Sequence, residues 1–248
     1  MPDQGEWYAH HTAQVYLMPR GTGRSTPIRS VADVTYLQAA HDLEAARRAL
    51  GISRWVFEGY SGGCMVGLLY ALAYPRSLDG LICGFSVANT MRALTEAGER
   101  STISARHPNC RGDLDAARLR TAPREPAALL SSDYAWLQAR PNLWLLVQGE
   151  TPLLARQVEQ LTPRQKAWFE EIWTFDVSDR LAEINVPTLV VCGRNDEIVP
   201  FEHCVAIHEG IDGSELLLLE NSGHDSVSEQ DAGIYHETIL RFIARMAD

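Results

Sequence analysis

Short apolar runs alternate with amphipathic stretches over much of this chain. The apolar runs are three to six residues long, as is typical of short buried strands, and are bounded by glycine, proline or polar turn residues. They lie at residues 14–18, 55–57, 80–84, 188–192 and 214–219. Helical periodicity marks residues 35–50, 65–74 and 229–246. Strands that alternate with helices predict an α/β fold with a mostly parallel sheet flanked by helices and right-handed crossovers.

Two of these helices carry further signals in their side chains. In the helix at residues 35–50, apolar positions recur at helical spacing, and Gly51 follows as a stop signal. In the last helix, the apolar residues on one face are Tyr235, Ile239, Phe242, Ile243 and Met246. We expect this face to lie on the sheet, because an amphipathic helix buries its apolar side.

Residues 86–175 break this rhythm. Strand-like runs largely vanish there, and helical segments separated by proline replace them. Thr162-Pro163-Arg164-Gln165 combines a capping residue, a first-turn proline and a capping-box glutamine, and so marks one helix start. We therefore expect a helical cap or lid at 86–175, inserted into a core formed by 1–85 and 176–248. The alternative is that these are extra helices of the main domain.

Composition narrows the function classes. A chain of 248 residues with 46% hydrophobic residues can bury one large core. The net charge of −10 and the lack of a Lys/Arg cluster argue against a nucleic-acid partner, which would need concentrated positive charge. No apolar run reaches the roughly 18 residues needed to span a membrane, and the first residues do not read as a signal peptide. We expect a cytoplasmic protein with no membrane partner.

Cysteine and histidine give no sign of a metal or cofactor site. The five cysteines form no Cys-x-x-Cys pair, and three lie in or beside apolar runs, so reduced, buried thiols are expected. The eight histidines make no ligand-like cluster with cysteines or carboxylates. We expect no metal and no other cofactor.

The chemistry is concentrated at Gly59-Tyr60-Ser61-Gly62-Gly63, which follows the apolar run at 55–57 and leads into a helix. A serine at such a strand-to-helix turn has a strained backbone that lifts its hydroxyl above the sheet. We expect a glycine on each side of it, because strand and helix pass too close for a β-carbon. The helix would begin just behind Ser61, so that its free N–H groups face any negative charge that develops there. A five-residue motif is weak evidence alone, and Ser61 could be only a turn residue.

Three other stretches strengthen the interpretation, because they occur in a fixed order with the first. They are Arg20-Gly21-Thr22-Gly23-Arg24-Ser25, the run from Val186 to Pro200 that contains Gly193-Arg194-Asn195-Asp196, and Asn221-Ser222-Gly223-His224. With Gly59–Gly63, these residues resemble the α/β-hydrolase superfamily. The likeness is to its cap-bearing serine members, similar to proline iminopeptidase-type peptidases and related esterases.

A catalytic triad of Ser61, Asp196 and His224 follows from this order and from physical requirements. A neutral serine needs a base within hydrogen-bond reach, and a histidine can accept and return a proton near neutral pH. The histidine in turn needs a carboxylate to fix its tautomer. His224 and Asp196 each follow a predicted strand in a loop, and we expect the Gly62 N–H to contribute to an oxyanion hole.

Alternatives remain for the acid and the base. Asp196 could cap the helix near Phe201, or Glu197 could be the acid instead. The other candidate histidines lie inside probable helices and lack the loop setting; they are His203, His208 and His236.

The start of the chain departs from the family pattern. The family has further strands there, and its third strand ends in a His-Gly or similar loop that gives the second oxyanion-hole N–H. Residues 1–13 offer no such strand, and the missing third strand would lie between the runs at 14–18 and 55–57. We expect that the true start lies upstream of Met1; a naturally truncated chain is the alternative.

The resulting hypothesis is a serine hydrolase that cleaves an ester or amide bond of a small molecule or short peptide. Possible pocket-lining tryptophans of the cap are Trp136, Trp144, Trp168 and Trp173, and Glu170-Glu171 is its only adjacent acidic pair. The competing hypothesis is a catalytically impaired, truncated remnant or a small-molecule binding protein.

Overall fold

The computed structural model describes residues 11–21, 23–90, 175–196, 198–224 and 226–246. Within them a four-stranded parallel sheet has the order β1-β2-β3-β4. The strands are β1 (Trp55–Tyr60), β2 (Leu78–Gly84), β3 (Thr188–Gly193) and β4 (Glu215–Leu219). The α/β class is confirmed, as are the strands predicted at 55–57, 80–84, 188–192 and 214–219. All carboxyl ends of these parallel strands meet at one edge, where an active site of this fold class is expected.

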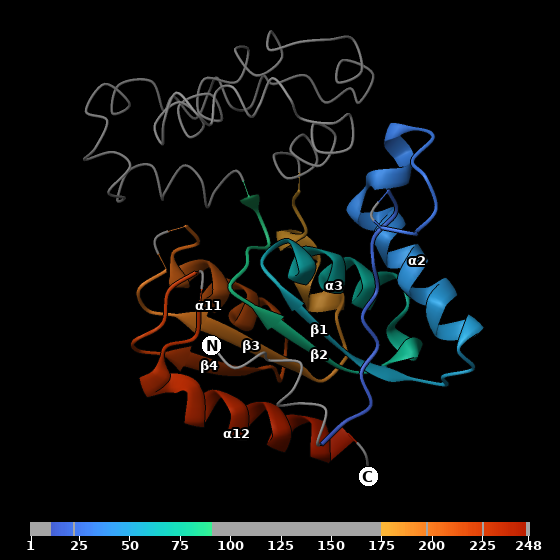
Figure 1. Ribbon diagram of the computed structural model, residues 1–248. Coiled ribbons are helices and arrows are strands. Elements are labelled where there is room, and N and C mark those ends of the chain that lie inside the picture. The colour runs from blue at the N-terminus through green and yellow to red at the C-terminus, as the bar shows by residue number, and fades with distance from the viewer. Residues whose placement is uncertain (1–10, 22, 91–174, 197, 225, 247–248) are drawn as a thin grey trace, which may run out of the picture.

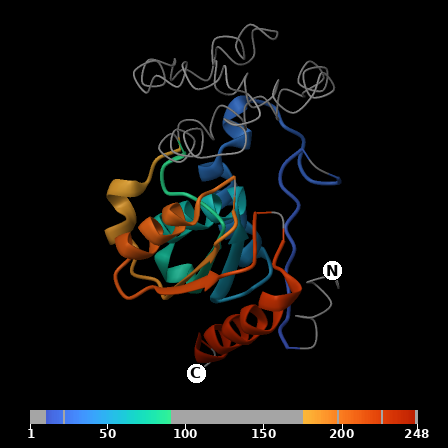
Figure 2. The same ribbon diagram turned by 90° about the vertical axis from the view of Figure 1, so that its left-hand side faces the viewer.

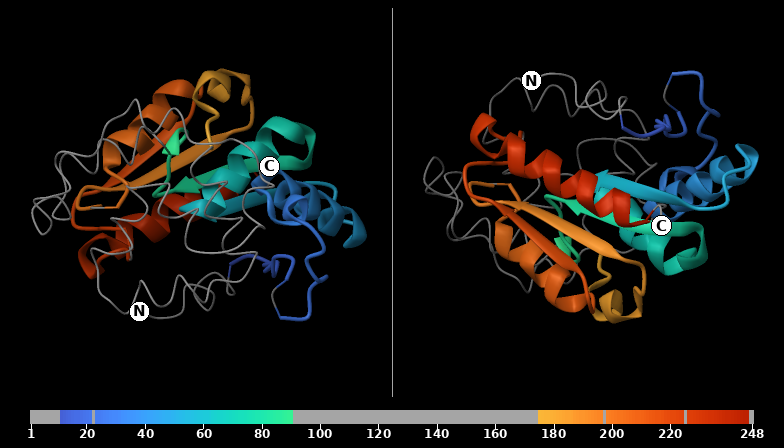
Figure 3. Two further views of the ribbon diagram at one scale, coloured as in Figure 1. Left: turned by 90° about the horizontal axis from the view of Figure 1, so that it is seen from above. Right: turned by 90° about the horizontal axis from the view of Figure 1, so that it is seen from below.

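Helices cover both faces of this sheet (Figures 1 and 3). The helices α2 (Tyr36–Ala49), α3 (Gly62–Ala73) and α11 (Phe201–Gly210) share the larger apolar cluster with one face. Of the described helices, only α12 (Glu229–Met246) packs on the other face, through the predicted stripe that includes Tyr235, Ile239 and Phe242. Short 3-10 helices lie at Val31–Val34, Pro75–Ser77 and Ser178–Glu183. No helix of the described ranges is long and apolar enough to cross a membrane.

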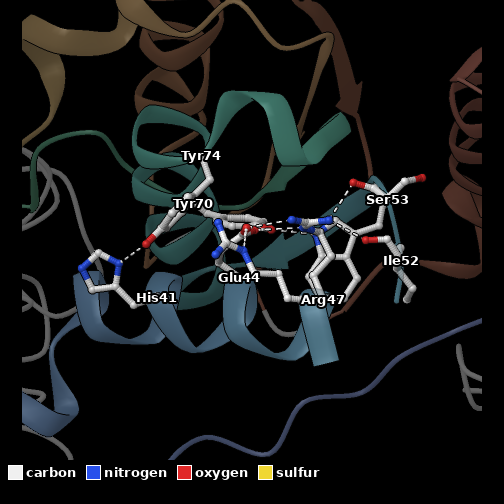
Figure 4. Close-up of polar contacts among 9 residues, drawn as sticks. His41, Glu44, Arg47, Ile52, Ser53, Tyr70 and Tyr74 are labelled. Carbon is white, nitrogen blue, oxygen red and sulfur yellow. Dashed lines mark hydrogen bonds and ion pairs between the residues drawn. The ribbon is translucent and has the colours of Figure 1, made fainter. Parts of the chain in front are cut away.

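A buried polar network joins α2 to α3 and to the start of β1 (Figure 4). The Glu44 side chain is only 5% exposed and accepts hydrogen bonds from Arg47, Arg48 and the Tyr70 hydroxyl. The Tyr70 hydroxyl in turn accepts one from the Trp55 indole N–H at 3.1 Å. The Arg47 guanidinium holds the pKa of Glu44 well below its usual range, and burial raises the pKa of Tyr70 to about 12.

The strand predicted at residues 14–18 is wrong. These residues adopt no regular structure and pair with none of the strands described here. Their apolar side chains are exposed, Tyr16 by 74%. Figure 2 shows the segment, in dark blue, running outside the layer of strands. Backbone N–H and C=O groups form a strand only with a neighbour, and β1 ends the sheet among the described strands without reaching this segment.

The expectation of five reduced cysteines is also wrong. Cys64, in the first turn of α3, forms a disulfide with Cys83 on β2, and their Cα atoms lie 5.0 Å apart. The pairing arises because α3 packs directly on β2 and brings together two residues 19 apart in sequence. Cys192 and Cys204 are free and buried, and Cys110 lies outside the described residues.

The described residues on either side of 91–174 lie side by side. The Val177 N–H donates to the Ala88 carbonyl at 2.8 Å, and the Thr90 N–H donates to the Phe175 carbonyl at 3.1 Å. Asn89 and Asp176 form an isolated antiparallel bridge between these bonds. Residues 88–90 and 175–177 are therefore neighbours in the structure. Most of the expected cap at 86–175, with its tryptophans and Glu170-Glu171, lies outside the described residues.

Candidate active site

Ser61 lies at a sharp turn between β1 and α3. Its φ of 51° and ψ of −119° are rare for a residue with a side chain, as predicted for this motif. A β-carbon on Gly59 would lie 2.4 Å from the Gly63 carbonyl oxygen, so only glycine fits there. The same expectation for Gly63 is wrong, because a β-carbon there would meet no atom within 4 Å beyond its own helix. The close approach of strand and helix therefore requires glycine at position 59, on the strand side of the turn, and not at position 63.

His224 reaches Ser61 from the loop that follows β4. Its Nε2 lies 3.2 Å from the Ser61 Oγ, and its Nδ1 lies 2.8 Å from the Asp196 Oδ2. The His224 side chain is 13% exposed, and its ring lies against Tyr60 with 5.5 Å between ring centroids. The structure therefore brings all three predicted side chains into one hydrogen-bonded series.

Asp196 is held from two directions in the loop after β3. Its side chain is 1% exposed. While Oδ2 faces His224, Oδ1 accepts the backbone N–H groups of Ile198 at 2.9 Å and Val199 at 2.7 Å. Helix α11 begins at Phe201 with Pro200 in the capping position, so Asp196 orders the preceding loop rather than capping that helix. Glu197, the alternative acid, lies outside the described residues.

The loop that carries His224 has an anchor that the sequence analysis missed. Asp231, in the first turn of α12, accepts hydrogen bonds from the Asn221 N–H at 2.8 Å and the Ser222 hydroxyl at 2.7 Å. Burial alone would raise the pKa of Asp231, but these hydrogen bonds outweigh it and hold the pKa below its usual value. The only sequence signal was an acidic residue in a first helical turn, which is common.

Gly62 is the first residue of α3, directly after Ser61. A helix offers no intrahelical acceptor for the N–H of its first residue, and the positive end of its dipole points the same way. The Gly62 N–H is therefore available beside the Ser61 hydroxyl. The other candidate histidines lie in helices as predicted, with His203 and His208 in α11 and His236 in α12.

Comparison with known proteins identifies the family. A profile of the alpha/beta hydrolase fold matches residues 9–231. A proline iminopeptidase of Xylella fastidiosa is 26% identical over 241 residues, which cover 86% of this chain and 74% of that protein. A putative carbamate hydrolase RutD of Pseudomonas savastanoi is 30% identical over 227 residues, which cover 90% and 80%.

Solved structures agree on the fold. The proline iminopeptidase of Mycobacterium smegmatis superposes with a TM-score of 0.60 at 24% identity, over 92% of this chain and 79% of that one. A hydrolase from Bacillus anthracis gives 0.59 at 22% identity, over 92% and 80%. The expected resemblance to hydrolases of the proline iminopeptidase type is confirmed. The chain belongs to the alpha/beta hydrolase family of enzymes.

Proposed function

We propose that this chain is a serine hydrolase that cleaves an ester or amide bond of a small molecule or short peptide. The observation that carries the proposal is the hydrogen-bonded series from Ser61 Oγ through His224 to Asp196. A serine, a histidine and a carboxylate in this order are the arrangement that activates a hydroxyl as a nucleophile.

The geometry assigns a role to each atom of the series. With the His224 proton on Nδ1, that N–H donates to Asp196, and Nε2 is left to accept the Ser61 proton. Ser61 Oγ then attacks the substrate carbonyl carbon while its proton moves to His224. The imidazolium formed is stabilised by the Asp196 carboxylate, and the Gly62 N–H stabilises the oxyanion.

Collapse of the tetrahedral intermediate completes acylation. The carbon–oxygen or carbon–nitrogen bond of the substrate breaks, and the leaving group takes the proton from His224. Water then attacks the acyl-enzyme with His224 as base, and breakdown of the second tetrahedral intermediate releases the acid and restores Ser61. No cofactor is needed for either half of this cycle.

The substrate class follows from the relatives and from the chain's organisation. The relatives named above are a proline iminopeptidase and a putative carbamate hydrolase, and each name implies hydrolysis at a carbonyl carbon. We assign residues 1–85 and 176–248 to the catalytic core and 86–175 to a cap that shapes the substrate pocket. The pairing of residues 88–90 with 175–177 supports an insertion between them that leaves the core intact.

Labelling with a fluorophosphonate tests the proposal, because such reagents modify activated serines. We expect one covalent adduct on the purified wild-type chain, mapped to Ser61 by peptide mass spectrometry. Ser61→Ala should abolish it, and His224→Ala should slow it at least about 100-fold, since the base is lost. A folded wild-type protein that takes up no label would overturn the proposal and favour a non-catalytic binding protein.

A further inference from the structure

Two residues at the active-site edge share an unusual backbone conformation. Ser61 and Phe85 both have φ of 51°, and they are the only described non-glycine residues with positive φ. Each directly follows a strand, and β1 and β2 are parallel neighbours with Tyr60 in register with Gly84. The two strained turns therefore lie side by side. The proposed catalytic steps account for the strain at Ser61 but not for that at Phe85.

The turn at Phe85 places the next residue, Ser86, beside the backbone of Ser61. The Ser86 hydroxyl donates to the backbone carbonyl of Ser61 at 2.8 Å. Ser86 is 1% exposed, so water cannot readily replace that hydroxyl. The Ser61 N–H donates to the Gly84 carbonyl, also at 2.8 Å. Residues 84–86 therefore hold the backbone of Ser61 at both its donor and its acceptor.

The bond to the Ser61 carbonyl also acts on Gly62, because the two groups belong to one peptide unit. The Ser61 C=O and the Gly62 N–H lie in the same plane and point in opposite directions. The same carbonyl also accepts the Cys64 N–H of α3 at 2.9 Å, so the Ser86 hydroxyl is the side-chain donor of a pair that fixes the carbonyl and with it the direction of the N–H. Hydrogen bonding to the carbonyl also polarises the amide and makes its N–H a stronger donor.

Ser86 is itself held firmly. Its carbonyl accepts the Cys204 thiol of α11 at 3.4 Å, and the preceding Phe85 N–H donates to the Val191 carbonyl at 2.9 Å. The Phe85 ring is buried and lies 4.8 Å from the Tyr60 ring, centroid to centroid. Contacts to β1, β3 and α11 thus preorganise the hydroxyl, as an electrostatic site requires.

We propose that Ser86 is a positioning residue that aims the Gly62 N–H at the oxyanion, acting through the Ser61 carbonyl. The inference rests on the proposed function for its catalytic consequence, but the orientation of the Gly62 amide can be measured without activity. This role accounts for the strained turn at Phe85, because that turn brings the Ser86 hydroxyl within hydrogen-bond distance of the Ser61 carbonyl.

The test compares Ser86→Ala with Ser77→Ala. Ser77 is also a buried serine, 7% exposed, and it lies near Glu44, away from Ser61. With a chromogenic ester, Ser86→Ala should lower kcat about 10-fold and change KM less than about 2-fold. This loss is smaller than the roughly 10²- to 10³-fold expected when an oxyanion donor is removed outright. Ser77→Ala also removes a buried hydroxyl and should leave kcat unchanged. Ser86→Thr, which keeps a hydroxyl, should recover most of the rate.

A second readout separates this inference from the proposed function. The NMR resonance of the Gly62 amide is measured in protein that keeps Ser61 and has met no substrate or label. It should shift in Ser86→Ala and not in Ser77→Ala. If the wild-type chain neither turns over nor takes up fluorophosphonate, the proposed function fails while the amide shift still decides the role of Ser86. The inference is overturned if Ser86→Ala keeps both the wild-type Gly62 resonance and, in an active protein, the wild-type kcat, with stability the only property that falls.

Discussion

Glu44 and Asp196 are both buried carboxylates, but their partners differ. Glu44 bonds to two guanidinium groups and a phenol between α2 and α3 (Figure 4). Asp196 bonds to two backbone N–H groups and to His224 at the edge where the strands end. Burial alone therefore does not distinguish a structural carboxylate from one at a candidate active site.

The distinction lies in what the partners can do. Guanidinium groups stay charged at every accessible pH, and the pKa of Glu44 is lowered, so the Glu44 network keeps one protonation state around neutral pH and serves to join elements. Backbone donors and a histidine hold Asp196, and a histidine, unlike a guanidinium, is a side chain that can take a proton from a hydroxyl and return it. The second network also ends at the Ser61 hydroxyl, whereas the first ends at the Tyr70–Trp55 pair.

Asp196→Asn should have the largest effect of any conservative change to either network. The amide keeps the shape of the carboxylate, but it no longer stabilises the tautomer of His224 or the imidazolium. We expect kcat to fall about 10⁴-fold, as when the acid of such a triad is neutralised. The melting temperature should fall only slightly. Steady-state kinetics with an activated ester and a thermal melt measure the two effects. A variant with undiminished kcat would assign the acid role to another residue, with Glu197 the first to test.

Glu44→Gln should have the opposite effect to Asp196→Asn, lowering stability and leaving kcat unchanged. It leaves the Arg47 guanidinium partly buried without its counter-ion, and removing one partner of a buried pair costs about 3 kcal/mol at the lower end of the usual range. Turnover per folded molecule should not change. Urea unfolding gives the free energy, and Arg48→Ala is the matched control: Arg48 bonds the same carboxylate but is 71% exposed, so its loss should cost under about 1 kcal/mol. Equal losses in the two variants would contradict the role of burial.

Lowering the pH should reduce the contribution of Glu44 to the free energy of unfolding gradually. Because the Arg47 guanidinium lowers the pKa of Glu44 in the folded state, the Glu44 contribution is complete above the ordinary pKa near 4.5 and is lost as pH falls toward the folded-state value. The gap in unfolding free energy between wild type and Glu44→Gln should therefore be constant from pH 7 to 5 and narrow below pH 4.5. Melts across pH 3 to 7 measure it. A constant gap down to pH 3 would show that Glu44 titrates normally.

Sequence reasoning succeeded where the signal is local. The strand-turn-helix at Ser61 and the order of Asp196 and His224 were readable, because a short apolar run followed by special turn residues defines each one. The strand at 14–18 failed because a strand also requires a neighbour to pair with, which composition does not reveal.

Other features depend on tertiary contacts that leave no mark in the sequence. The Cys64–Cys83 disulfide requires α3 to lie on β2, which places their Cα atoms 5.0 Å apart. Glu44, Arg47 and Arg48 have the spacing of an ordinary solvated helix face, and only the packing of Tyr70 shows that Glu44 is buried. Ser86 belongs to no motif; its role depends on a hydrogen bond across neighbouring strands.

Tyr70→Phe should have the smallest effect and should sharpen the contrast between the networks. Burial raises the pKa of Tyr70 to about 12, so its hydroxyl stays protonated and donates to Glu44 throughout the neutral range. Removing one such hydrogen bond costs about 1 kcal/mol, and the phenyl ring keeps its contacts with Trp55 and Tyr74. Urea unfolding at pH 7 should show that loss with kcat unchanged. In a Glu44→Gln background the same substitution should cost less, because the charged acceptor is gone. If the two losses are simply additive, the Tyr70 hydroxyl is not coupled to the Glu44 charge, and the network is a set of independent contacts.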